Sequence, residues 1–203
     1  MIKTIIFDFG DVFINLDKSA TQRGLKSLGL SKFSEDMIII NQAFEMGLIS
    51  TQTFLEFYLE QIPKSNASEL INIWNSILLD FPLHRLEFLK KIKQEKRFEL
   101  ILLSNTNELH IESVKQNISF YKDFKACFDK FYLSHEIGLR KPNIDTFEFI
   151  LNENKLLAKE CFFIDDTKDH TKSAEKLGIK TWTINPKEDD ITEIFTKNGK
   201  VFV

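Results

Sequence analysis

The sequence is short of the residues that make loops and covalent cross-links. Its 203 residues include only 7 glycines, 4 prolines and 2 cysteines. This scarcity of glycine and proline predicts that most of the chain lies in regular helices and strands, without long flexible linkers. Cys127 and Cys161 are too few for a disulfide framework and lack a C-x-x-C metal spacing, so we interpret both as core thiols in a reducing compartment.

The sequence also lacks a surplus of positive charge and a long apolar run. Its 27 Lys and Arg residues against 30 Asp and Glu residues give a net charge of -3, which offers no broad cationic surface to nucleic acid. Asp8 interrupts the apolar beginning of the chain before a signal peptide can form, and no apolar run approaches membrane-spanning length. We therefore expect a cytoplasmic protein with neither a nucleic-acid nor a membrane partner.

What is abundant is apolar sequence, which makes up 43% of the chain and includes 20 phenylalanines. Five short apolar runs, each followed by polar or turn residues, are typical of buried strands: 3–7, 98–103, 130–133, 161–164 and 180–184. Helical patterns lie between the later runs, over 107–117, 143–154 and 169–177. This alternation predicts an α/β fold with a Rossmann-like parallel sheet flanked by helices.

One stretch, from about residue 17 to residue 80, interrupts this alternation because its apolar residues recur at helical spacing. Turn residues divide it into four expected helices, which end near Gly29, Gly47, Pro63 and Asp80. The helix expected over 83–96 then returns the chain to the sheet, with an apolar stripe at Leu83, Leu86, Leu89 and Ile92. We therefore divide the chain into a core of residues 1–16 and 83–203 and an inserted all-helical cap of residues 17–82.

Candidate functional residues follow the predicted strands, because ligands bind at the carboxyl ends of the strands in open parallel sheets. Each of these polar residues alone also fits a turn former or a helix cap. The adjacent Asp165 and Asp166 are stronger evidence, since two carboxylates directly after a buried strand repel each other unless a cation joins them. Oxygen ligands of this kind suit Mg²⁺. The full set is Asp8, Ser104-Asn105, Arg140-Lys141-Pro142 and Asp165-Asp166.

The order of these four sets resembles the four motifs of the haloacid dehalogenase superfamily of phosphohydrolases. The matching segments are 5–10 (IIFDFG), 102–107 (LLSNTN), 138–142 (GLRKP) and 163–166 (FIDD). Each segment alone is a weak pattern, but all four in order are specific, and the resemblance spans almost the whole chain. The predicted insertion also occupies the place of the α-helical cap in one branch of that superfamily.

The resemblance implies a role for each matching residue. Asp8 corresponds to the nucleophile that forms an aspartyl-phosphate, and Lys141 to the cation that pairs with it and with the phosphoryl oxygens. Ser104 and Asn105 correspond to the phosphate-binding motif. Mg²⁺ would be held by Asp8, the backbone carbonyl of Gly10, Asp165 and Asp166, with Asp166 as the direct ligand of the last pair.

The chain departs from the resemblance at Gly10, where most phosphatases of the group have a second aspartate that serves as general acid and base. Sugar-phosphate phosphatases with an Asp-x-Gly first motif share this glycine. Asp11 is the candidate substitute as proton donor, and it also fits a solvated turn residue.

The sequence therefore predicts Mg²⁺-dependent hydrolysis of a small phosphorylated metabolite, with a sugar phosphate as the first candidate, enclosed between core and cap. One alternative is a non-catalytic phosphoryl-binding or metal-binding regulatory protein that has lost turnover with the acid. The other is a metal-independent 2-haloacid dehalogenase, which the Asp165-Asp166 pair disfavours. The sequence predicts neither the physiological substrate nor the oligomeric state.

Other polar and aromatic residues have mainly structural interpretations. We interpret His110, His135 and His170 as solvated or capping residues, of which the first and last also suit the mouth of the site. Asn15 and Asp17 fit either substrate contact or capping of the first inserted helix. The aromatic residues of the insertion, Phe44, Phe54 and Phe57, fit packing.

Overall fold

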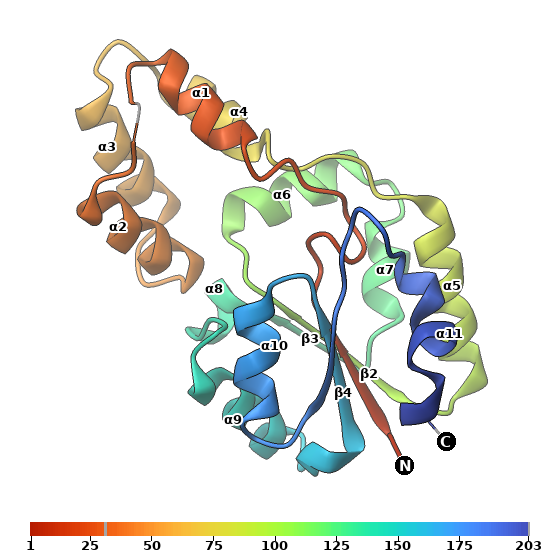
Figure 1. Ribbon diagram of the computed structural model, residues 1–203. Helices are drawn as coiled ribbons and strands as arrows, with labels where there is room; N and C mark the ends of the chain where they lie inside the picture. Colours follow the sequence, from red (N-terminus) through yellow and green to blue (C-terminus); the bar gives the residue numbers. More distant parts are fainter. Residues whose placement is uncertain (31, 203) are drawn as a thin grey trace.

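The computed structural model describes residues 1–30 and 32–202, and its centre is a five-stranded parallel sheet (Figure 1). The strand order is β3-β2-β1-β4-β5, so the chain leaves the central strand β1 toward one side of the sheet and later returns to its other side. This confirms the predicted α/β class. The strands are β1 (Thr4–Phe7), β2 (Glu99–Ser104), β3 (Lys130–Leu133), β4 (Cys161–Asp165) and β5 (Lys180–Thr183).

Helices cover both faces of the sheet because successive side chains of a buried strand point to opposite faces. Ile5 and Phe7 belong to one hydrophobic cluster, which packs against α5 (Leu83–Glu95), α6 (Glu108–Asn117), α7 (Tyr121–Ala126) and α11 (Ile194–Asn198). Ile6 belongs to a second cluster, which packs against α9 (Ile144–Glu153) and α10 (Lys168–Glu175). The short helix α8 (Ser134–Ile137) follows β3, and 3₁₀ turns lie at Ala158–Glu160, Ile191–Glu193 and Gly199–Val201.

The stretch expected to be helical forms four helices, α1 (Ala20–Ser27), α2 (Glu35–Glu45), α3 (Thr51–Gln61) and α4 (Ala67–Asn75). The side chains of Ser34, Ser50 and Asn66 cap α2, α3 and α4 by accepting a backbone N–H in the first turn. These helices have a hydrophobic cluster of their own, built around aromatic residues that include Phe44, Phe54, Tyr58 and Trp74. The insertion therefore packs on its own apolar residues as well as on the core.

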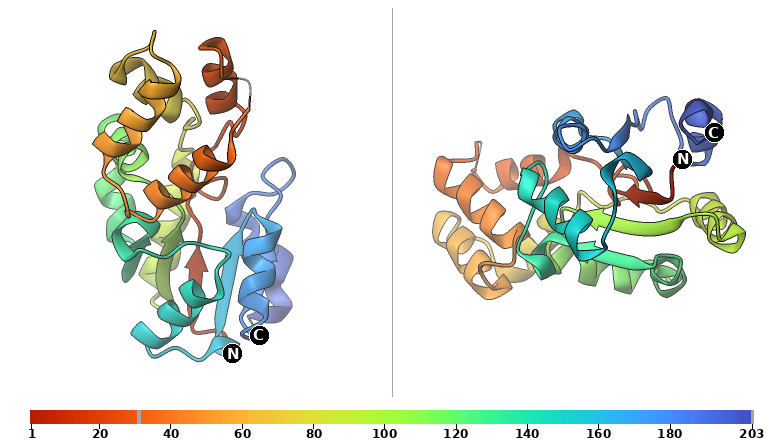
Figure 2. Two further views of the ribbon diagram at one scale, coloured as in Figure 1. Left: turned by 90° about the vertical axis from the view of Figure 1, so that its left-hand side faces the viewer. Right: turned by 90° about the horizontal axis from the view of Figure 1, so that it is seen from below.

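The insertion lies beyond the carboxyl ends of the strands, while both chain termini lie at the opposite end of the sheet (Figures 1 and 2). Contacts between α4 and α6 and between α2 and α8 join it to the core. The insertion is therefore placed over the edge of the sheet at which the candidate site residues were expected.

Two details of the predicted helices are wrong. The fourth helix ends at Asn75 rather than near Asp80, because a turn at residues 76–77 follows and Leu78 then forms an antiparallel bridge with Leu16. Leu83 is 53% exposed, so it does not belong to the buried stripe of α5, which Leu86, Leu89 and Ile92 form. The sequence pattern also did not predict α7, α8 and α11.

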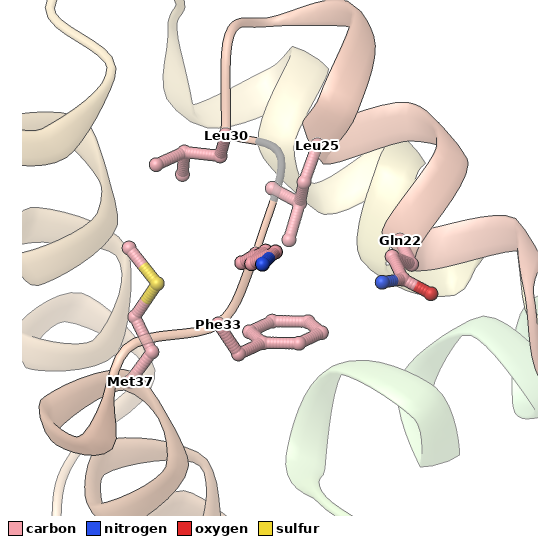
Figure 3. Close-up of a pocket in the computed structure, with 6 residues that line it drawn as sticks. Gln22, Leu25, Leu30, Phe33 and Met37 are labelled. Carbon is pink, nitrogen blue, oxygen red and sulfur yellow. The ribbon is translucent and has the colours of Figure 1, made fainter.

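A small apolar pocket lies inside the insertion and is lined by Gln22, Leu25, Leu30, Lys32, Phe33 and Met37 (Figure 3). Leu25 and Met37 are buried in the cluster of the insertion, so this pocket is a packing gap beside α1 and α2. None of the candidate site residues lines it. In the part of the chain that the structure describes, no helix combines the length and the apolarity needed to cross a membrane.

Candidate active site

The centre of the candidate site is the ammonium group of Lys141, whose side chain is fully buried. Its Nζ lies 2.8 Å from Asp8 Oδ1 and 2.6 Å from Asp165 Oδ2, and it donates a third hydrogen bond of 2.8 Å to the Leu103 carbonyl. Asp8 directly follows β1 and its backbone N–H donates to the Ile164 carbonyl, which fixes it beside β4. The parallel register thus brings residues from four separate segments to one point.

Burial and charge act on the two carboxylates in opposite directions. Burial raises the pKa of Asp8 to about 6, against the lowering effect of the nearby Lys141 ammonium. Burial also opposes ionisation of Asp165, but there the Lys141 ammonium and His170 prevail and lower its pKa to about 2. The same two carboxylates raise the pKa of Lys141 in spite of its burial. The site therefore contains a buried cation between two carboxylates, of which Asp165 is held in its charged form more strongly than Asp8.

Among the described residues, one group of acidic side chains could hold a metal ion, namely Asp8, Asp165 and Asp166, with one oxygen of each within 4.8 Å of the others. Asp8 Oδ2 and the Gly10 carbonyl accept no hydrogen bond from any residue that the structure describes. Asp165 differs, because its oxygens already accept hydrogen bonds from the Thr167 N–H and from Lys141. The donor set therefore fits a hard divalent cation, with Asp8 and the Gly10 carbonyl as the free ligands, while Asp166 is paired with the exposed Lys18.

The end of β2 and the loop after it place Ser104 and Asn105 beside this cluster. Ser104 is buried as the last residue of β2. The Asn105 side chain exchanges two hydrogen bonds with the backbone of Lys141, at 2.8 and 2.9 Å, so its amide positions the lysine. The Asn105 backbone N–H donates to no acceptor in the described part of the chain and is available to an anion.

The segment that carries Lys141 needs one glycine for its conformation. Gly138 ends α8 with φ of +71°, in the left-handed region that other residues adopt only with strain. This turn leads the chain to Lys141, where the hydrogen bonds of Asn105 hold it.

Asp11, the predicted proton donor, lies at the edge of the cluster and is engaged on both oxygens. Its Oδ1 accepts the Leu16 N–H at 2.9 Å, and its Oδ2 lies 3.1 Å from Lys18 Nζ. Lys18 also pairs with Asp166. The space that a side chain at position 10 would enter is filled, since a Cβ built on Gly10 meets Leu16 Cδ1 at 2.7 Å.

Two of the histidines have specific contacts instead of being solvated. His110 belongs to α6 and faces α4, where burial lowers its pKa to about 4. It also lines the cavity beside the site, as the alternative interpretation expected. Its Nε2 lies 3.2 Å from the Trp74 carbonyl. His170 Nδ1 lies 2.9 Å from Asp165 Oδ2. His135 is half-buried, and its Nδ1 has no hydrogen-bond partner within the described residues.

Asn15 and Asp17 have structural contacts. Asn15 donates to Asp80 and accepts from Arg85, both at 2.9 Å, which ties together the two connections between core and insertion. Asp17 accepts from the Ser19 N–H at 3.1 Å and pairs with Arg23, so it stabilises the beginning of α1. The packing interpretation of the aromatic residues agrees with the cluster described above.

Two residues near the site were missed in the sequence, namely Lys18 and Glu45. Both lie in the insertion and meet core residues far along the chain, Lys18 with Asp166 and Glu45 with Arg140. No local motif marks them. Only the placement of the insertion over the sheet edge brings them there.

A cavity of about 130 Å³ that opens to solvent lies between the insertion and the core next to the cluster. Its polar lining residues include Ser104, Asn105 and His110 of the core and Glu45 of the insertion. Its apolar lining residues are Phe9, Ile14, Leu16, Ile77, Leu78, Ile111 and Val114. The site can therefore hold a small molecule with its anionic end at the carboxyl edge of the sheet.

Comparisons with known proteins agree with this geometry. A D-ribitol-5-phosphate phosphatase from Bacteroides thetaiotaomicron is 26% identical over 193 residues, which are 90% of this chain and 91% of that protein. A haloacid dehalogenase family enzyme from the same organism, solved as a magnesium complex, is 34% identical with a TM-score of 0.83, over 93% of this chain and 96% of that one.

A further likeness supports the fold alone. The structure of a predicted haloacid dehalogenase-like hydrolase from Porphyromonas gingivalis is 24% identical with a TM-score of 0.82, over 100% of this chain and 98% of that one.

Residues 5–184, which include all four candidate motifs, match the family of haloacid dehalogenase-like hydrolases. The chain therefore belongs to the haloacid dehalogenase-like hydrolase family and is an enzyme of that family.

Proposed function

We propose that this enzyme is a Mg²⁺-dependent phosphatase that hydrolyses a small sugar or polyol phosphate through an aspartyl-phosphate at Asp8. The observation that carries the proposal is the state of Asp8. One of its oxygens is held by the buried Lys141, and the other accepts no hydrogen bond from the described residues, beside two further carboxylates. This is the arrangement that a carboxylate nucleophile next to a cation requires.

In the proposed reaction, a carboxylate oxygen of Asp8 attacks phosphorus while the bond from phosphorus to the alkoxide oxygen breaks. The alkoxide takes up a proton and leaves as the alcohol. Water then cleaves the acyl phosphate, which releases inorganic phosphate and restores Asp8. Lys141 neutralises charge on the phosphoryl oxygens, and the Ser104 hydroxyl and the Asn105 backbone N–H orient them.

Asp8, the Gly10 carbonyl and Asp166 would hold Mg²⁺, which would replace the exposed Lys18 beside Asp166. The fully buried Asp165, held by Lys141, His170 and the Thr167 N–H, would act through water. The bound ion would supply further neutralisation of the phosphoryl charge. The magnesium complex of the relative from Bacteroides thetaiotaomicron supports this assignment.

The leaving alkoxide needs a proton. Asp11 stays the candidate from the chain, but its contacts with the Leu16 N–H and Lys18 orient both of its oxygens within the protein. A water molecule or a hydroxyl of the substrate is the alternative source. In either case, we expect aryl phosphates, whose leaving groups need no proton, to be hydrolysed readily.

The substrate class follows from the cavity and from the relatives. The cavity suits a molecule of a few carbon atoms, and the relative from Bacteroides thetaiotaomicron is named a D-ribitol-5-phosphate phosphatase. The insertion, taken as a cap of residues 17–82, would close over this molecule and exclude water from the acyl phosphate.

The test is phosphate release from ribitol 5-phosphate, ribose 5-phosphate, glycerol 3-phosphate and p-nitrophenyl phosphate, with Mg²⁺ and after treatment with EDTA. We expect release only with Mg²⁺, and recovery when excess Mg²⁺ is added back. Release that survives EDTA would contradict the metal assignment. Phosphoryl binding without any release would favour the regulatory alternative, and metal-independent dechlorination of 2-chloropropionate would favour the dehalogenase.

A further inference from the structure

The cavity beside the candidate site has a single carboxylate among its described lining residues, and this carboxylate comes from the insertion. Glu45 is the last residue of α2, and the cavity also includes Ser104 and Asn105, which we assign to the phosphoryl group. Glu45 thus lies on the same cavity as the phosphoryl-binding residues but belongs to a different part of the chain. Its position suits contact with the carbon skeleton of a substrate.

The side chain of Glu45 is fixed by one oxygen only. Both contacts with Arg140, from Nε at 3.0 Å and from Nη2 at 2.9 Å, go to Oε2. Oε1 accepts no hydrogen bond from any residue that the structure describes. A guanidinium and a carboxylate that served only to join the two regions would be expected to use both oxygens in a fork-to-fork pair.

The backbone on both sides of this pair is held in place. Arg140 precedes Lys141, whose backbone exchanges two hydrogen bonds with Asn105. On the other side, Gly47 packs so closely on α8 that a Cβ built there would lie 2.1 Å from the His135 carbonyl oxygen. These contacts at both ends define where Glu45 lies relative to the phosphoryl-binding residues in this structure.

The surroundings of Glu45 favour a hydrogen-bonding ligand. The carboxylate is 31% exposed and burial raises its pKa, with Arg140 opposing this effect. A partly desolvated carboxylate oxygen without a donor gains from a hydroxyl that replaces the lost water. The apolar residues that also line the cavity suit the C–H groups of the same molecule.

We propose that Glu45 is a specificity-determining residue, whose Oε1 accepts hydrogen bonds from the hydroxyl groups of a polyhydroxylated phosphate monoester while Arg140 holds Oε2. This assignment rests on the proposed phosphatase function. It selects polyol and sugar phosphates over phosphates of the same size that have no hydroxyl groups.

The experiment compares kcat/KM for ribitol 5-phosphate and for p-nitrophenyl phosphate in the wild type, Glu45→Gln, Glu45→Ala and Glu35→Gln. Glu35 is an exposed residue in the first turn of the same helix, so it controls for the loss of a charge on α2. The ratio to compare is kcat/KM for ribitol 5-phosphate divided by kcat/KM for p-nitrophenyl phosphate. We expect Glu45→Ala to reduce this ratio about 10- to 100-fold, mainly by raising KM for ribitol 5-phosphate. Glu45→Gln should have a smaller effect of the same sign, and Glu35→Gln should leave the ratio at its wild-type value.

Each other outcome has a distinct meaning. An equal loss for both substrates in the Glu45 variants would make Glu45 a structural contact between insertion and core, and an unchanged ratio would remove it from substrate selection. A wild-type enzyme that hydrolyses neither substrate with Mg²⁺ would overturn the proposed function and this assignment with it. A wild type that hydrolyses p-nitrophenyl phosphate keeps the proposed function whatever the Glu45 variants show.

Discussion

The two sides of the candidate site are built in different ways. On the core side, the side chains of Asp8, Lys141 and Asp165 are 11%, 0% and 0% exposed and are joined by ion pairs of 2.6–2.8 Å. On the insertion side, Glu45 and Arg140 meet through side chains that are 31% and 21% exposed. The groups assigned to chemistry are thus fixed by the sheet, whereas those assigned to substrate choice depend on how the insertion packs. Changes in the two regions should therefore have different consequences.

The largest effect is expected from Asp8→Asn on the core side. An amide is not a competent nucleophile toward phosphorus, so phosphatase activity should fall by more than about 10³-fold. Lys141 keeps its pair with Asp165, so the variant should remain folded. Phosphate release with Mg²⁺ measures the effect, and Asp145→Asn, an exposed change on α9, is the control. Activity near the wild-type value in a variant whose mass confirms the amide would remove Asp8 from the mechanism.

The buried cation offers a second test of the core side. Lys141→Met leaves Asp8 and Asp165 buried without their cation, and breaking a buried pair in this way costs about 3–5 kcal/mol of unfolding free energy. Lys18→Met is the matched control, because Lys18 also pairs with two aspartates but is 54% exposed. Its loss should cost less than about 1 kcal/mol.

Urea unfolding without Mg²⁺ measures both lysine variants. Equal losses of unfolding free energy in the two variants would show that the buried Lys141 stabilises the protein no more than the exposed Lys18 does. Added Mg²⁺ should stabilise the Lys141 variant, since a cation near Asp8 replaces part of the missing charge.

These core residues are also the part of the site that the sequence predicts well. Each lies directly after a strand or at a turn, so local pattern and the rule for parallel sheets place it at the same edge. The strands and most core helices were predicted within a residue or two for the same reason. The end of α4 was missed because the pairing of Leu78 with Leu16, rather than helix propensity, decides the conformation there.

The insertion side was not predictable in this way. Glu45 and Arg140 are 95 residues apart in the sequence, and Lys18 and Asp166 are 148 apart. Helical periodicity indicates which residues of α2 are buried, but it does not indicate which element of the core they face. His110 was misassigned for the same reason, since its partner in the insertion is a backbone carbonyl of α4.

Gly47→Ala tests whether the packing of α2 on α8 controls substrate affinity. Both Gly47 and Gly29 have a positive φ, of +65° and +98°, so alanine is strained at either position by about 1 kcal/mol. Only at Gly47 does the added Cβ meet the His135 carbonyl, whereas at Gly29 no described atom lies within 4 Å. Gly47→Ala should therefore push α2 away from the core and raise KM for ribitol 5-phosphate about 10-fold or more.

Gly29→Ala is the control for backbone strain alone and should leave that KM unchanged. Steady-state kinetics on both variants measure KM for ribitol 5-phosphate, and unfolding curves confirm that both variants are folded. If the two alanine variants raise KM equally, strain in the insertion rather than its contact with α8 would explain the effect.

The smallest expected effect concerns pH and the contact of His110 with the insertion. The hydrogen bond from Asn107 Nδ2 to His110 Nδ1 requires the neutral ring, because the Asn107 oxygen is already held by the His110 backbone N–H. A protonated Nδ1 would face a second donor. Burial and this arrangement both favour the neutral form, in agreement with the lowering of the pKa of His110 to about 4.

Whether stability rises or falls with pH depends on how strongly His110 binds a proton in the folded and in the unfolded protein. Between pH 6.5 and 4, His110 is protonated in the unfolded chain but neutral in the folded one, so stability is full above pH 6.5 and is lost as pH falls toward 4. From pH 7 to pH 5 the loss due to this residue should be about 2 kcal/mol. Urea unfolding of the wild type and of His110→Gln at both pH values measures the contribution of His110 to this loss, because the other titrating groups are common to the two proteins. The variant should lose less stability than the wild type over this range, and an identical loss would show that His110 is protonated in the folded enzyme at pH 5.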